Sequence, residues 1–312
     1  MQVNSGWPIA RYRFIFSVQT PVGLPEYAGS MLRGAFGHAL LRTACMTREK
    51  QCAQCPLYFT CPYTAIFQAP VPSSHPLQKF SAVPHSYVIE PPPWGRRVYQ
   101  PGELLIFEMT LFGQALERLA LIVFTWQRAF MHSVGGGTAT LDDVILLGPE
   151  WDESVFDASA NRVRPHPQRL FLPSLPEGNC RLTFITPLRL QENGRVLQPE
   201  QLNARILLMA LARRVSLLFE IHGNLVPEYD FQMMNAAASS IRMSQNLQWQ
   251  YWMRWSSRQQ QKMTLNGLLG DITLYDVPAF FYELLQLGQW THIGKNTTFG
   301  LGHYLLTLES RS

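Results

Sequence analysis

The order of strand and helix patterns constrains this chain most, because the same order runs through it twice. Apolar and polar residues alternate over Arg11–Gln19, which predicts a strand, and Ser30–Arg42 has an apolar face at helical spacing. Two strands, a helix and a closing strand follow, and the second half repeats the series. Each half is therefore predicted to be a β-α-β-β-α-β unit, which is the ferredoxin-like arrangement. We expect an α+β protein with two such domains in tandem.

The predicted elements and domains have the following bounds. In the first half we expect strands at Arg11–Gln19, Ser86–Glu90, Leu104–Leu111 and Asp142–Leu147, and helices at Ser30–Arg42 and Gln114–Phe130. In the second half we expect strands at Cys180–Ile185, Leu247–Trp255, Leu268–Leu274 and Tyr304–Leu308, and helices at Asn203–Phe219 and Val277–Leu287. Ser30 is a suitable N-cap for the first helix. The domains are then residues 1–150 and 179–312, and a linker rich in proline and arginine spans 151–178.

The composition is that of a soluble protein and permits a nucleic-acid partner. The 312 residues are 46% hydrophobic, which is enough for two cores, and the net charge is +4. Several arginine clusters contain few acids, for example Arg11 with Arg13 and Arg96 with Arg97. They suit phosphate contacts or simply solvated faces. The start of the chain does not resemble a signal peptide, and the most apolar stretch, Leu116–Phe130, contains charged residues. We expect a cytoplasmic protein with no membrane partner.

Four cysteines lie close together in an insert, residues 45–70, that follows the first predicted helix. Cys45, Cys52, Cys55 and Cys61 have the spacing C-x6-C-x2-C-x5-C, while the fifth cysteine, Cys180, is far away. In a cytosolic chain such a cluster indicates a metal site rather than disulfides. Four thiolates suit structural Zn²⁺ and also an iron–sulfur cluster, and the sequence does not separate the two. Alternatively, one of the end thiols is not a ligand.

A glycine-rich loop at residues 293–303 joins the last predicted helix to the last strand. Its glycines, Gly294, Gly300 and Gly302, let backbone N–H groups approach a ligand, and Lys295 adds positive charge. Such a turn can hold the phosphates of a polynucleotide. The alternative is a tight helix-to-strand connection with glycines at positive φ.

Four motifs in order resemble one family. They are Gly29-Ser30-Met31-Leu32-Arg33-Gly34-Ala35-Phe36-Gly37-His38, the cysteine insert ending in Cys61-Pro62-Tyr63, the segment from Trp255 to Gly270 with Arg258 and Lys262, and Ile293-Gly294-Lys295 through Gly302. Together they resemble the CRISPR repeat-processing endoribonucleases of the repeat-associated mysterious protein (RAMP) superfamily, and the closest branch carries a cysteine insert. The resemblance runs from about Tyr12 to Leu308.

The resemblance implies an activity and roles for particular residues. Such enzymes cut CRISPR repeat RNA in precursor transcripts without a catalytic metal. The ribose 2′-hydroxyl attacks the adjacent phosphate and leaves a 2′,3′-cyclic phosphate. His38 is the expected proton-transfer residue, with Tyr27 assisting and Arg33 holding the scissile phosphate or pairing with an acid. RNA-binding roles are expected for a further set: Arg258, Lys262, Gly294, Lys295, Gly300 and Gly302.

Other histidines are weaker candidates. His292 and His303 flank the glycine-rich loop and come second to His38. The remaining ones are expected to serve packing or surface roles: His75, His85, His132, His166 and His222.

Two other functions remain open at this point. Related RAMP proteins hold RNA without cutting it, so the chain is alternatively a repeat-RNA-binding subunit of a CRISPR ribonucleoprotein. In that case its partners include guide RNA and other CRISPR effector subunits. A third possibility is that the cysteine insert itself is the functional part and docks a protein or reads nucleic acid. If His38→Ala loses cleavage but still binds RNA, the result would favour the enzyme over the binding subunit.

Overall fold

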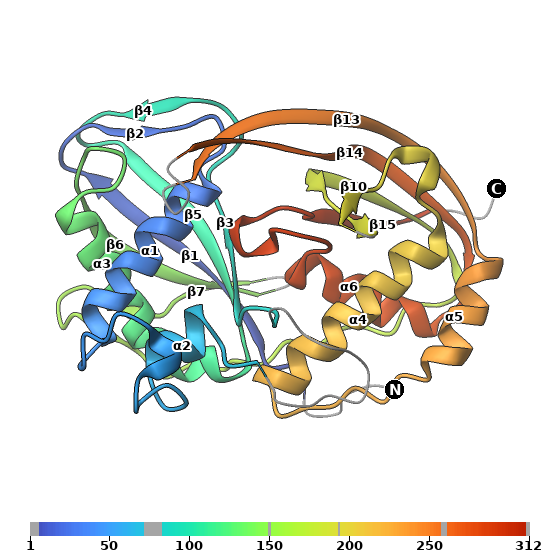
Figure 1. Ribbon diagram of the computed structural model, residues 1–312, viewed down its shortest axis with the longest axis horizontal. Coiled ribbons are helices and arrows are strands. Elements are labelled where there is room, and N and C mark those ends of the chain that lie inside the picture. Colours follow the sequence, from blue (N-terminus) through green and yellow to red (C-terminus); the bar gives the residue numbers. More distant parts are fainter. Residues whose placement is uncertain (1–5, 72–82, 149–150, 193, 257–260, 310–312) are drawn as a thin grey trace. The chain divides into compact units, whose positions relative to one another are not determined.

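A computed structural model of the chain describes residues 6–71, 83–148, 151–192, 194–256 and 261–309 (Figure 1). The chain divides into two compact units. The N-terminal unit comprises Pro8–Leu170 and Ile221–Asn224, and the C-terminal unit comprises Met1–Trp7, Phe171–Glu220 and Leu225–Ser312. No helix in the described ranges combines the length and the apolar character that crossing a membrane requires.

The N-terminal unit is a sheet with two long helices against it. Its sheet has the order β3-β5-β1-β6-β7, and the pairs are antiparallel. The strands are β1 (Ile9–Val18), β3 (Tyr87–Glu90), β5 (Leu104–Phe112), β6 (Ala139–Leu147) and β7 (Asp152–Ser154), and the helices are α1 (Gly29–Ala44) and α3 (Leu119–His132). A 3₁₀ turn, η2 (Gly113–Arg118), precedes α3, and a second small sheet pairs β2 (Val22–Leu24) with β4 (Arg97–Tyr99).

Aromatic side chains fix α1 and α3 on this sheet. Phe14 of β1 stacks on Phe107 of β5 at 5.4 Å between ring centroids, and Trp126 of α3 lies 4.6 Å from Phe107. Phe36 of α1 stacks on the same Trp126 at 5.1 Å. These rings are buried. Because both helices contact one aromatic cluster, they lie side by side (Figure 1), and their outer residues face a common space.

The cysteine insert follows α1 and is joined to the core by the short helix α2 (Pro62–Phe67). Tyr63 and Ile66 of α2 are buried in the core of this unit. A Cβ on Gly37 of α1 would lie 2.3 Å from the ring of Phe67, so this glycine makes room for α2. Gly34, in contrast, faces open space. Both glycines precede His38 in the sequence, and only Gly34 has open space beside it.

His222 makes the stability of the N-terminal unit depend on pH. Its side chain is buried, and its Nε2–H donates to the carbonyl of Pro84 at 2.7 Å. Burial lowers the pKa of His222, and the hydrogen bond to Pro84 opposes that shift in part. The folded pKa therefore lies below the unfolded value of about 6.5. As the pH falls below about 6.5, the unfolded chain binds a proton that the folded chain does not yet bind, so the free energy of unfolding falls.

We expect His222→Gln to flatten the dependence of unfolding free energy on pH. The glutamine amide does not titrate, so the loss of stability between about pH 7 and pH 5 becomes smaller than in the wild type. Urea unfolding at a series of pH values measures this slope. His132→Gln is the matched control, because His132 is exposed. Equal slopes for the wild type and His222→Gln would contradict the assignment.

The C-terminal unit has a second antiparallel sheet with the order β13-β14-β10-β15. The strands are β10 (Gly178–Leu188), β13 (Arg242–Ser256), β14 (Gln261–Val277) and β15 (Tyr304–Glu309), and the helices are α4 (Ala204–His222), α5 (Phe231–Ser240) and α6 (Phe280–Thr291). The last two residues of α4 are counted with the N-terminal unit. In both sheets the first strand of the β-α-β-β-α-β series lies between the third and the fourth strand of that series. In the N-terminal unit β1 lies between β5 and β6, and in the C-terminal unit β10 lies between β14 and β15. Short pieces complete the unit: β11 (Gln191–Glu192), β12 (Arg195–Val196), η3 (Pro199–Gln201) and η4 (Thr297–Phe299).

A half-buried arginine fixes the end of α6, where the glycine-rich loop begins. Arg214 of α4 donates three hydrogen bonds to carbonyl oxygens, two to Thr291 at 2.6 and 2.9 Å and one to His292 at 2.9 Å. These carbonyls are among the groups that a helix end leaves without a helical partner. Burial lowers the pKa of Arg214 to about 10. The start of the loop is thus held by charge-assisted hydrogen bonds from α4.

The structure confirms the expected order of strands and helices and differs at several points. Ser30 lies inside α1, whose N-cap is Ala28, and that end has no side-chain cap. Helix α5 was not expected. Part of the expected linker forms the short strands β7, β8 (Phe156–Asp157) and β9 (Arg162–Val163). The first arginine cluster is used in ion pairs, with Arg11 at 3.1 Å from Glu90 and Arg13 at 2.8 Å from Glu108, so carboxylates neutralise it.

Candidate functional site

His38 lies on the outer side of α1 and lines a cavity of about 280 Å³ between α1 and α3. The apolar face of α1, with Leu32, Phe36 and Leu40, is buried, which turns His38 to the surface. The lining residues come from both helices and are Ala35, His38, Ala39, Arg42, Arg128, Ala129, His132 and Ser133. Three of them are alanines, whose small side chains leave the space open. The remaining larger side chains are two histidines and two arginines.

The cavity is basic. Its lining contains no aspartate or glutamate. Within the described ranges, neither Arg42 nor Arg128 takes part in an ion pair. The Arg128 guanidinium lies 5.8 Å from the centre of the Phe124 ring on the same helix, which leaves its charge uncompensated. Cationic groups that converge without acids suit an anionic ligand such as a phosphate.

Tyr27 does not line this cavity. Its ring is buried just before α1 and lies 4.6 Å from the ring of Trp94. Burial, and secondly the charge of Glu90, raise the pKa of its hydroxyl well above the usual value. His38 is about nine residues into α1, or roughly 14 Å along the helix at about 1.5 Å per residue. The structure therefore does not bring Tyr27 and His38 together.

Arg33 also lies away from the cavity. Its guanidinium is 4.5 Å from the centre of the Phe67 ring, and its Nη2 is 3.3 Å from His85 Nε2. No acid among the described residues forms an ion pair with it. The contact with Phe67 connects α1 with α2, so the position of Arg33 in this unit is that of a residue supporting the insert.

The glycine-rich loop is held by its own backbone and by the end of β10. The N–H of Lys295 donates to the carbonyl of Arg189 at 2.8 Å, and the N–H of Gly302 donates to Pro187 at 3.0 Å. Gly294 and Gly302 have φ angles of 94° and 73°, and a Cβ on Gly302 would lie 1.9 Å from the carbonyl oxygen of Ile293. These glycines have the positive φ angles and the close backbone contacts of a tight helix-to-strand connection, which was the alternative interpretation of this loop.

Of the other expected RNA-binding residues, Lys295 is exposed on this loop. Gly300 is buried, has a φ angle of 93° and has its N–H bonded to Thr297. Arg258 lies outside the described residues. The backbone of Lys262 pairs with Trp255 across the β13–β14 hairpin, so this lysine lies in strand β14 rather than in the connecting loop.

Two second-line histidines are stacked on each other at the loop. The rings of His292 and His303 are parallel within 9°, with centroids 4.6 Å apart. His292 is fully buried, and its Nδ1 is 3.3 Å from the carbonyl oxygen of Leu301. This arrangement connects the two ends of the loop.

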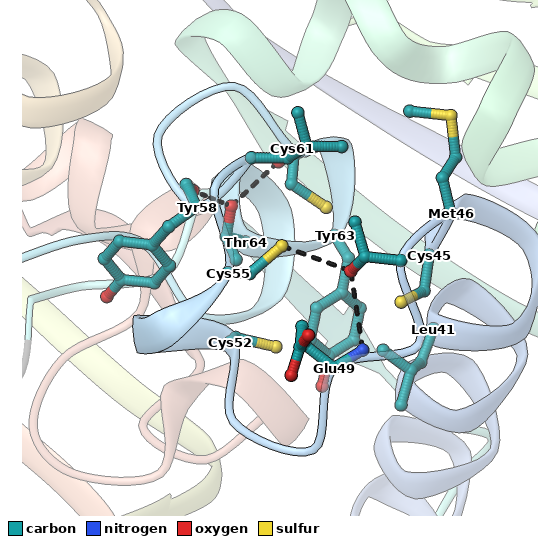
Figure 2. Close-up of a pocket in the computed structure, with 12 residues that line it drawn as sticks. Leu41, Cys45, Met46, Glu49, Cys52, Cys55, Tyr58, Cys61, Tyr63 and Thr64 are labelled. Carbon is teal, nitrogen blue, oxygen red and sulfur yellow. Dashed lines mark hydrogen bonds between the residues drawn. The ribbon is translucent and has the colours of Figure 1, made fainter.

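The four clustered cysteines surround one small space. Figure 2 shows their sulfur atoms turned toward it, with Cys45 from the end of α1 and the other three from the insert. The cavity that they line has a volume of about 20 Å³, enough for a single atom or ion. The N–H of Arg48 donates to Cys45 Sγ at 3.3 Å. Burial raises the pKa of Cys52, and the negative charges that the other three cysteines carry as thiolates raise it further. A cation would relieve that repulsion, so the donor set fits a metal.

Two family models match the chain. Residues 7–168 match the AF_1859_N model, which describes an N-terminal domain and covers more than half of the chain. The chain belongs to the AF_1859_N family. Residues 182–304 match a second model, CRISPR-associated endoribonuclease Cas6. No curated protein matches the sequence.

Solved structures share the fold at low sequence identity. A Cas6 product complex has a TM-score of 0.56 and 14% identity, and the match covers 96% of this chain and 100% of that chain. A partial Cas6-RT-Cas1–Cas2 complex has a TM-score of 0.54 and 12% identity, with 96% of this chain and 46% of that chain covered. At these identities the likeness establishes a mixed α+β fold of the Cas6 kind.

Sequence reasoning missed three residues of the basic cavity: Arg42, Arg128 and His132. His132 was assigned a packing or surface role, and the helix that carries it was expected to end at Phe130, whereas α3 extends to His132. A signal was nevertheless present. Arg128 and His132 are four residues apart, as are His38 and Arg42, so each pair lies on one face of its helix. Only the packing of α1 against α3 shows that the two faces meet.

Proposed function

We propose that this protein is an endoribonuclease that cuts CRISPR repeat RNA in precursor transcripts and releases guide units. The match of residues 182–304 to the Cas6 endoribonuclease model carries the proposal. The similar structures support its partners, since one is a product complex and another joins Cas6 to Cas1 and Cas2. Repeat RNA, guide RNA and other CRISPR proteins are accordingly the partners of this chain.

The proposed architecture is two ferredoxin-like domains in tandem, at 1–150 and 179–312, with a linker at 151–178. The strand orders β3-β5-β1-β6 and β13-β14-β10-β15 support it, because both follow the same β-α-β-β-α-β pattern. The cysteine-rich insert belongs to the first domain.

The proposed reaction needs no catalytic metal. The 2′-hydroxyl of the ribose attacks the adjacent phosphorus, the 5′-oxygen leaves, and a 2′,3′-cyclic phosphate remains. This requires one group to take a proton and another to give one. His38 is proposed as one of these groups, since it is exposed in a basic cavity. Tyr27 and Arg33 support the position of α1 from outside the cavity.

RNA binding is proposed for the glycine-rich loop and the β13–β14 hairpin. Lys295 is exposed on a loop whose backbone is rigidly held, which lets it contact a phosphate at little cost in entropy. Gly294, Gly300 and Gly302 shape that loop. Arg258 and Lys262 are proposed to contribute positive charge from the hairpin.

The four cysteines of the insert are proposed to hold one structural metal, Zn²⁺ or an iron–sulfur cluster. Cys45, Cys52, Cys55 and Cys61 would supply all the ligands, and a site closed by four protein ligands serves folding rather than catalysis. Its contribution is to hold α2 against the core.

Cleavage of the repeat RNA from the neighbouring CRISPR array, labelled and in excess EDTA, tests the proposed function. We expect one cut, a 2′,3′-cyclic phosphate on the upstream product, and no cut when a single 2′-deoxy sugar stands at the cleavage position. A deoxy sugar removes the nucleophile without removing the phosphate contacts.

The competing function is a repeat-RNA-binding subunit without activity. The positions of Tyr27 and Arg33 favour it, because neither lies in the cavity of His38. Tight binding of both RNAs without any cut would establish that function and rule out the enzyme.

A further inference from the structure

The basic cavity between α1 and α3 contains a second histidine that the expected reaction leaves unused. His132 is the last residue of α3, and it lines the same cavity as His38 on α1. Both side chains are exposed, so a ligand in the cavity can reach both imidazoles. The cavity lies wholly within the N-terminal unit and has a volume of about 280 Å³, which is ample for a phosphodiester with one adjoining sugar.

The helix ends account for only part of this arrangement. Arg42 and His132 lie in the last turns of α1 and α3, where positive charge is favourable. That effect explains one cation on each helix. It does not explain why Arg128 and His38, one turn earlier on their helices, converge with them on one cavity without an acid. Two guanidinium groups and two imidazoles that line one cavity form a site for a phosphodiester.

We propose that this cavity binds the scissile phosphate of the RNA and that His132 is the second proton-transfer residue beside His38. The inference rests on the proposed endoribonuclease function. Arg42 and Arg128 hold the non-bridging oxygens, since a planar guanidinium binds phosphate with two parallel hydrogen bonds. Histidine is the side chain best suited to exchange protons near neutral pH.

The two imidazoles close the proton balance of the reaction. One neutral imidazole takes the proton of the 2′-hydroxyl as the bond from the 2′-oxygen to phosphorus forms. One imidazolium gives its proton to the 5′-oxygen as the bond from phosphorus to that oxygen breaks. The products are a 2′,3′-cyclic phosphate and a 5′-hydroxyl. The pair ends with its protons exchanged, and the arginines stabilise the charge that builds up on the phosphorane.

The test compares His38→Ala and His132→Ala on two RNA substrates under single-turnover conditions in EDTA. One is the natural repeat RNA, and the other carries sulfur in place of the 5′-bridging oxygen at the cut. A thiolate leaves without a proton, so this substrate no longer needs the general acid. We expect each variant to cut natural RNA about 10²–10⁴-fold more slowly than the wild type. The sulfur substrate should restore the rate of one variant, the one lacking the acid, and not that of the other.

Controls separate chemistry from folding. Met131→Ala changes an exposed side chain of α3 that does not line the cavity, so its rate should equal that of the wild type. The thermal unfolding of each histidine variant should match that of Met131→Ala. Arg128→Lys keeps the charge but not the two parallel hydrogen bonds, so we expect slower cleavage with nearly unchanged binding of the 2′-deoxy RNA.

Each of the following three outcomes would contradict the proposal that His132 transfers a proton. If His132→Ala cuts natural RNA as fast as Met131→Ala, His132 takes no part, and the proposed endoribonuclease function still stands. If His132→Ala is slow and the sulfur substrate restores neither variant, His132 affects structure rather than proton transfer. If the wild type binds both RNAs and cuts neither, the endoribonuclease function fails together with this inference.

Discussion

His38→Ala is expected to lower the single-turnover rate of repeat-RNA cleavage by about 10²–10⁴-fold, the usual contribution of a positioned general acid or base. The side chain is exposed on the outer face of α1, and the residues that hold that helix, Phe36 among them, are on the other face. The variant should therefore fold as the wild type does. Cleavage of end-labelled repeat RNA measures the rate.

Binding of the uncut RNA is the control for this result. Because His38 contributes one of several contacts in the cavity, the affinity for 2′-deoxy RNA should change by only a few-fold at fixed salt. Imidazole added to the buffer should restore part of the activity of His38→Ala, since it fits the space that the substitution opens. A wild-type rate in His38→Ala would remove this histidine from the mechanism.

Most of the fold was predicted from the spacing of apolar residues, which differs between helices and strands. The apolar faces of α1 and α4 and the alternation in β1 are local signals, so they could be read without knowledge of tertiary contacts. Helix α5 was missed although it has a local signal too. Asp230 caps it by accepting from the N–H groups of Gln232 and Met233 at 3.0 and 2.9 Å, and three alanines follow.

The parts of the site that depend on tertiary packing could not be predicted. The ring of Phe67 fills the space beside Gly37, and nothing in the sequence spacing of the two residues indicates this contact. Tyr27 precedes α1 in the sequence and was expected to assist His38, but it is buried against Trp94. His132 is 94 positions from His38 in the sequence, so only the aromatic contacts between α1 and α3 bring the two into one cavity.

Removal of the metal proposed for the insert is the second large effect that we expect. Structural zinc contributes about 10–16 kcal/mol of apparent binding free energy in small zinc-binding peptides, much of it as folding energy. In this chain the insert is connected to the core through Tyr63 and Ile66 of α2. Chelation, or Cys52→Ser, should therefore lower the thermal unfolding temperature of the N-terminal unit, while the C-terminal unit is unaffected.

Metal content and unfolding temperature, measured on the same samples, check this prediction without any reference to RNA cleavage. Elemental analysis should find one zinc ion per chain, or iron with visible absorption if a cluster is bound. Cys180→Ala is the matched control, because that thiol is buried in β10 of the other unit and does not line the cavity of the four clustered cysteines. It should leave the metal content unchanged. If the purified protein holds no metal and the wild type and Cys52→Ser unfold at the same temperature, the four cysteines pack as plain thiols. If Cys52→Ser loses the metal and unfolds at a lower temperature, the insert is a metal-dependent support for α1, the helix that carries His38.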